Sequence, residues 1–114
     1  MKYALLLYDN PANWANVDDD RMKSLHAGYM AVSDAPESYG GAQLQPAEAG
    51  KTVRANGGGE LLVTDGPFAE TKEVISGFYL VDADSEERAL ELAKQIPTVS
   101  QMGGAIEVRP IVER

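Results

Sequence analysis

The sequence predicts a single α+β domain over residues 1–114, with the element order β-α-β-β-β-α-β. Segments 2–8 and 74–81 are apolar on both alternating faces, which is typical of strands buried on both sides. The turn at 56–59, Asn-Gly-Gly-Gly, predicts a hairpin between two further strands. A content of 44% hydrophobic and 25% charged residues in 114 supports a globular chain with one core.

Two segments have helical spacing and recognisable ends. The first begins at Asp18–Asp20, whose carboxylates suit the N-cap and first turn, and Pro36 ends it. Its expected inward stripe has spacings of three and four: Met22, Leu25, Tyr29 and Val32. The second is expected to be capped by Asp84, with Glu87 three residues later, and to stop at Pro97. Its expected inward residues are Ala89, Leu92, Ala93 and Ile96.

Five segments are expected to be strands: 2–8, 51–55, 60–64, 74–81 and 105–112. Gly40 and Gly41 predict a loop, and residues 43–48 are expected to be irregular. Pro110 predicts that the last strand lies at an edge or ends there.

This element set predicts a homodimer. Two helices cannot cover both faces of a four- or five-stranded sheet, yet two of the strands are apolar on both faces. One sheet face would therefore stay exposed and apolar. A second copy packed sheet to sheet, in an isologous dimer, would cover it.

Charge and composition exclude several classes of function. With 10 Lys and Arg against 18 Asp and Glu, the net charge of −8 makes nucleic acid and anionic membranes poor partners. The longest apolar run, 3–8, is too short for a membrane span or a signal-peptide core. The chain has no cysteine, which fits a reducing compartment, so we expect a soluble cytoplasmic protein.

No motif predicts a cofactor or a metal. Gly57–Gly59 precedes a strand, whereas a phosphate loop precedes a helix. Asp9 with Asp18–Asp20 does not match the spacing of a calcium-binding loop. We therefore expect neither.

His26 and Asp65 are the candidate catalytic residues. His26 is the single histidine, and histidine is the side chain that titrates near neutrality without help. Asp65 begins the turn Asp-Gly-Pro-Phe and could orient the imidazole. The alternatives are a partly buried structural histidine and an ordinary turn in which Phe68 fills the core.

Three residues are candidates for substrate binding: Tyr8, Tyr39 and Lys72. The two tyrosines could line a pocket or fill the core. Lys72 could bind an anionic substrate group, although a Lys–Glu neighbour pair is more often a solvated surface feature.

The nine residues 65–73, DGPFAETKE, resemble the DGPF branch of the YCII-related family. Residues 1–8 (MKYALLLY), 44–46 (LQP) and 107–110 (EVRP) follow the same family pattern, so the resemblance covers nearly the whole chain. It implies a ferredoxin-like fold with an antiparallel sheet that forms a dimeric α/β barrel. The predicted helix ends early, at Pro36, which departs from the family pattern. This departure affects the wall of the candidate binding pocket near Tyr39.

The resemblance also implies two functions of different classes. Relatives carry a His and an Asp suggested as a catalytic pair, which match His26 and Asp65 here. The first function is therefore a cofactor-free enzyme of isomerase or lyase type that transfers a proton on a small cyclic or aromatic metabolite. The second is a non-catalytic dimer that binds a metabolite or a protein, because relatives are often encoded beside extracytoplasmic-function sigma factors.

Overall fold

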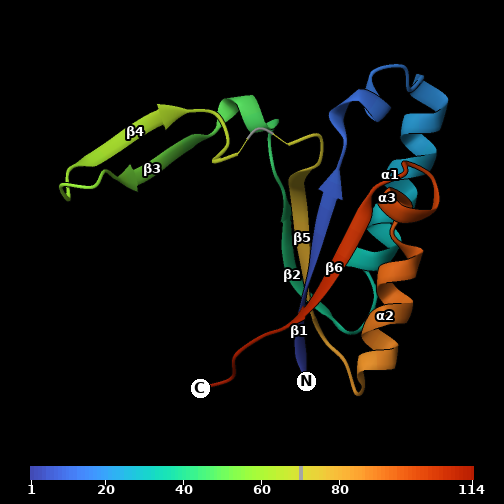
Figure 1. Cartoon of the computed structure of the whole chain (residues 1–114). Helices are drawn as coiled ribbons and strands as arrows, with labels where there is room; N and C mark the ends of the chain where they lie inside the picture. The colour runs from blue at the N-terminus through green and yellow to red at the C-terminus, as the bar shows by residue number, and fades with distance from the viewer. Residues whose placement is uncertain (70) are drawn as a thin grey trace.

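The computed structural model describes residues 1–69 and 71–114 and has an α+β architecture (Figure 1). The main antiparallel sheet has the order β2-β5-β1-β6, built from β1 (Lys2–Asp9), β2 (Ser38–Gln43), β5 (Val74–Asp82) and β6 (Ala105–Pro110). The helices are α1 (Asp19–Ser33), α2 (Glu86–Gln95) and α3 (Pro97–Ser100), with 3-10 turns η1 (Pro11–Trp14) and η2 (Ala47–Ala49). This confirms the predicted α+β class with an antiparallel sheet and is compatible with a ferredoxin-like fold.

One face of the sheet, the helix face, carries the core. Along β1 the buried residues alternate, and Tyr3, Leu5 and Leu7 point toward the helices. The predicted inward residues of α2 are all buried there, which confirms that stripe. The core consists of Tyr3, Leu5, Leu7, Val32, Tyr79, Val81, Ala83, Ala89, Leu92, Ala93 and Ile96.

The opposite face of the sheet, the open face, is not covered by any helix of residues 1–69 and 71–114 (Figure 1). Strand register places there the residues that alternate with the core: Ala4, Leu6, Tyr8, Gly40, Ala42, Ile75, Phe78, Leu80, Glu107 and Arg109. Ile75 is 44% exposed, and Leu6 and Phe78 are half-buried. The uncovered apolar face predicted from the sequence is therefore present.

The second sheet is a two-stranded arm of residues 51–65, made by β3 (Lys51–Ala55) and β4 (Leu61–Asp65). The predicted hairpin and its turn are confirmed, but the hairpin is a separate sheet and does not extend the main one. Figure 1 shows the arm projecting from the main sheet on the side away from the helices.

Strand β2 corrects the prediction of a loop at Gly40 and Gly41. These glycines suggest a loop, but here they allow close strand pairing. A Cβ on Gly41 would lie 2.4 Å from the carbonyl oxygen of Phe78, and its φ of 147° favours glycine. The missing side chain thus lets β2 lie beside β5.

The helix ends differ slightly from prediction. Asp18 is the N-cap of α1 and accepts a hydrogen bond from the Arg21 amide at 2.7 Å, as expected. Met22 was expected to face inward and is instead 42% exposed. The cap of α2 is Ser85 and not Asp84, because the Ser85 hydroxyl accepts from the Arg88 amide.

A buried polar cluster ties the end of β1 to β5 and η1. Asp9 is 5% exposed, and its carboxylate accepts hydrogen bonds from Trp14 Nε1 at 3.1 Å and from the Ser76 hydroxyl. Ser76 is the extra residue where the β1–β5 register shifts, and such a bulge redirects a side chain. Both carboxylate oxygens are therefore satisfied, as a buried acid requires.

Two tyrosines fix α1 to the rest of the core. The hydroxyls of Tyr29 and Thr98 share a hydrogen bond of 2.6 Å, and the Tyr79 hydroxyl donates to the Tyr29 carbonyl at 2.9 Å. Burial raises the pKa of Tyr29 to about 12. Burial also raises the pKa of Tyr79.

We predict that Gly41→Ala lowers the free energy of unfolding by about 2–4 kcal/mol, through backbone strain and a clash with Phe78. Gly57→Ala is the control, because its added Cβ meets nothing within 4 Å, and it should change stability by less than about 0.5 kcal/mol. Urea denaturation followed by circular dichroism measures both. Equal stabilities would contradict the account of β2.

We predict that stability falls as the pH rises from about 10 toward 12, because the folded state keeps the Tyr29 proton longer than the unfolded state. Tyr29→Phe should lose about 1 kcal/mol at neutral pH with its hydrogen bond, and should show a shallower decline above pH 10. Exposed Tyr39→Phe is the control and should follow the wild type. An equally steep decline in Tyr29→Phe would contradict the assignment.

Candidate functional site

A pocket of about 700 Å³ lies where the arm joins the open face, and we call it the corner pocket. The sheet contributes Tyr8 from β1 with Val74 and Ile75 from β5. The loops contribute the remaining lining residues: Leu44, Gln45, Pro46, Ala47, Ala49, Gly50, Pro67, Phe68, Ala69, Thr71 and Glu73. Most of these side chains are apolar, as in pockets that bind small organic molecules.

Tyr8 lines this pocket from β1. Its hydroxyl donates a hydrogen bond of 3.1 Å to Glu107 Oε1, while Arg109 Nε donates to Glu107 Oε2 at 3.0 Å. The hydrogen bond to Glu107 raises the pKa of Tyr8, and Arg109 holds the pKa of Glu107 below its usual range. The Tyr8 hydroxyl is therefore held by β6, a strand that contributes no residue to the pocket lining.

The pocket's described lining carries no lysine or arginine. Its other polar side chains are Gln45, Thr71 and Glu73. A carboxylate without a lining cation disfavours an anionic ligand. The arrangement suits a neutral apolar molecule with a few hydrogen-bonding groups.

The predicted turn at Asp65 connects the arm to the pocket. Gly66, with φ 85°, donates its amide hydrogen to the Gly50 carbonyl at 2.8 Å and accepts from the Thr52 hydroxyl at 2.8 Å. Phe68 does not fill the core, since it is 72% exposed, lines the corner pocket and lies 5.1 Å from the Arg54 guanidinium. Glu70, within the same motif, lies outside the described residues.

His26 and Asp65 do not meet within one chain. His26 is exposed on α1, which packs on the helix face. Asp65 ends β4 at the base of the arm, where its carboxylate forms an ion pair with Lys51. Figure 1 shows α1 and the arm on opposite sides of the main sheet.

The three candidate binding residues have separate positions. Tyr8 lines the corner pocket, and its role in binding stays a prediction. Tyr39 on β2 is 49% exposed, outside the pocket lining, and its ring lies 5.5 Å from Lys2 Nζ. Lys72 is exposed and does not line the pocket, although both its neighbours do.

Sequence reasoning missed Leu44, Ile75 and Glu107 as site residues. Leu44 and Glu107 belong to sequence blocks that carry the family resemblance, so that signal could have drawn attention to them. Ile75 was one of several apolar residues in a strand, and only the register places it beside Tyr8.

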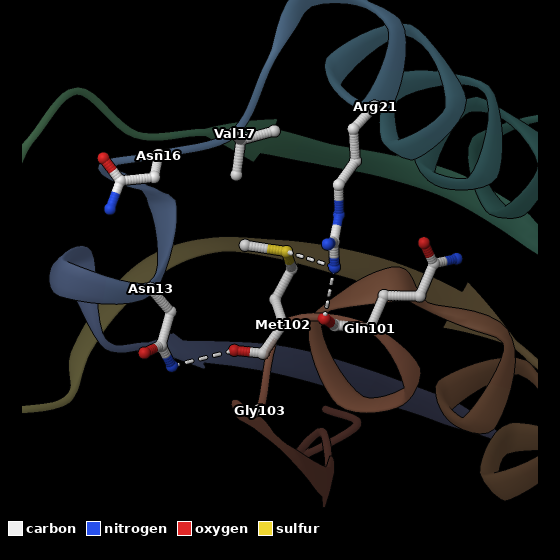
Figure 2. A pocket seen from close by; sticks show the side chains of 7 residues that line it. All are labelled: Asn13, Asn16, Val17, Arg21, Gln101, Met102 and Gly103. Carbon is white, nitrogen blue, oxygen red and sulfur yellow. Dashed lines mark hydrogen bonds between the residues drawn. The ribbon is translucent and has the colours of Figure 1, made fainter.

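A second, smaller hollow of about 370 Å³ lies on the helix side of the molecule (Figure 2). Arg21 of α1 donates to the Gln101 carbonyl at 3.0 Å, and Asn13 Nδ2 donates to the Met102 carbonyl at 3.0 Å. These polar groups are engaged with the chain itself, joining η1 and α1 to the turn before β6. The hollow therefore has a structural explanation.

Within residues 1–69 and 71–114, no group of three His, Cys, Asp or Glu side chains is arranged to hold a metal ion. The helices there are also too short or too polar to cross a membrane.

Comparison with known proteins gives two matches. The model of the YCII-related domain matches residues 1–114. An uncharacterized protein of Rhizobium meliloti (strain 1021), R00369, is 38% identical over 115 residues, covering 97% of this chain and 92% of that protein. The chain therefore belongs to the YCII-related family.

Proposed function

We propose that this protein is a homodimer that binds a small, neutral cyclic or aromatic metabolite in the corner pocket. The observation that carries the proposal is an apolar pocket of about 700 Å³ lined by Tyr8, Phe68 and Ile75. A cavity of that size suits a compact organic molecule. Phe68 and Ile75 would contact its apolar surface, with Tyr8 beside them.

The homodimer is supported by the open face. The strand register places Leu6, Phe78 and Ile75 on this face across adjacent strands, and exposed apolar faces on soluble proteins mark interaction sites. A second copy of the same face is self-complementary in an isologous dimer. Because the corner pocket begins at this face, dimerisation would also shield the pocket from solvent.

Proton transfer on the bound metabolite is the candidate reaction, with His26 and Asp65 as the proposed pair. The main sheet lies between α1 and the arm within one chain, so the pair would have to form between two copies, through a contact other than the sheet-to-sheet interface. Asp65 is exposed, which leaves it accessible to a second copy. In such a pair His26 would exchange the proton and Asp65 would favour the imidazolium.

The alternative is a protein-binding module linked to extracytoplasmic-function sigma-factor regulation. It rests on assigning the chain to the DGPF branch through residues 65–73, and the net charge of −8 supports a basic partner. Under this alternative the corner pocket would have no small-molecule ligand of its own.

We predict that Ala49→Phe abolishes small-molecule binding by filling the corner pocket. Phenol, indole and a six-membered lactone are suitable probes, detected by ligand-observed nuclear magnetic resonance. Ala31→Phe is the matched control, since Ala31 is an exposed alanine on α1, and it should bind as the wild type does. Equal binding by both variants would show that the probes bind elsewhere.

We predict that the wild type catalyses exchange of an acidic C–H of a bound ring compound with deuterium from the solvent, at least about tenfold faster than His26→Ala. Proton nuclear magnetic resonance in deuterated buffer measures the rate. A rate equal to that of buffer alone, for a compound that binds, would refute proton transfer and leave the binding function in place.

A further inference from the structure

The arm is the largest part of the molecule that the corner pocket does not explain. Its ladder pairs Val53 with Val63 and Ala55 with Leu61, and these four residues share one side, which we call the apolar face of the arm. Thr52, Arg54, Leu62 and Thr64 occupy the other side. There Arg54 stacks on Phe68 and the Thr52 hydroxyl bonds to Gly66.

The apolar face of the arm is uncovered. Val53 and Val63 are each 64% exposed, and Leu61 is 72% exposed. An isolated two-stranded hairpin is at best marginally stable in water and needs packing on another body. The rest of the same chain does not provide that body, because the arm projects away from it (Figure 1).

The solvent-exposed area of the chain shows how much surface is available for a contact with another body. A compact monomer of 12.3 kDa exposes about 6,100 Å². This chain exposes 7827 Å², and its radius of gyration of 16.0 Å exceeds the roughly 13 Å expected for its length. The excess of about 1,700 Å² per chain reflects its extended shape and leaves enough surface for an interface of the size found in permanent dimers.

The position and charge of the arm favour a second copy of this chain as the body that covers its apolar face. The arm extends on the side of the open face, so a body covering that face lies beside the arm. Lys51 and Arg54 balance Glu60 and Asp65, which makes the arm neutral in a chain of charge −8. A second acidic copy can therefore approach the arm without the repulsion it would meet elsewhere.

We propose that the apolar face of the arm packs against a second copy of the chain, so that each subunit of the dimer holds the other with its arm. This inference rests on the proposed homodimer and adds a second contact to the sheet interface. Gly50, Pro67 and Phe68 at the arm's base line the corner pocket. The second subunit, held by the arm of the first, therefore lies beside the corner pocket of the first and forms part of its surroundings.

Single cysteines test this contact, because the natural chain has none. Val63→Cys places a thiol on the apolar face of the arm, and Thr64→Cys places one on the opposite side of the same strand. Both positions are exposed in one chain. Each thiol is labelled with iodoacetamide, and mass spectrometry measures the rate of labelling at a protein concentration where light scattering gives twice the chain mass. The same rate is measured in urea, as the reference for the fully accessible thiol.

We expect Val63→Cys to react at least about tenfold more slowly than Thr64→Cys in the native dimer, and both to react equally in urea. Equal native rates in a protein that is dimeric would overturn the arm contact and leave the sheet dimer standing. A monomer at every concentration would overturn both. If Val63→Cys does not fold, Val53→Cys on the partner strand of the arm replaces it.

Discussion

The constraint on which the structure depends is a sheet with two apolar faces and helices on only one of them. Packing of α1, α2 and α3 on the helix face buries Tyr3, Leu5 and Leu7 from β1 and secures a core in the single chain. The alternating residues of the same strand face the other way. Every strand that contributes to the core therefore also contributes to the open face. A change in the position of a strand consequently alters both the core and the open face.

Adjacent residues at the end of β1 have different roles on the two faces of the sheet. Asp9 points to the helix face, where Trp14 and Ser76 satisfy its carboxylate. Tyr8 points to the open face and lines the corner pocket. The bulge at Ser76 connects these roles, because the extra residue supplies a hydroxyl to Asp9 while Ile75 stays paired with Tyr8.

Periodicity predicted the parts of the fold that depend on burial. The two-faced strands, the α2 stripe and the Asn56–Gly59 turn follow from local sequence, and the structure has all of them. Strand β2 could not be predicted in this way, since Gly41 is needed for close approach to Phe78, a residue far away in sequence. The exposed Phe68 was unpredictable for a similar reason, because an apolar residue in a turn gives no sign of whether it fills a core or lines a surface pocket.

The candidate site was only partly predictable. Tyr8 was predicted as an aromatic residue that could line a pocket or fill the core, but the pocket also needs η2 and the turn after β4, which meet the sheet through long-range packing. The pair of His26 and Asp65 was proposed from residue type and from the family resemblance, and the fold separates α1 from the arm within one chain. Any contact between them thus depends on assembly and not on the sequence of one subunit.

The central claim is that this chain reaches its functional form only as a dimer. Light scattering on the wild type over a wide range of concentrations tests it most directly. The account predicts twice the chain mass of 12.3 kDa down to the lowest concentration measured, since the open face and the apolar face of the arm would both be buried between the subunits. A stable, soluble monomer at every concentration would contradict it.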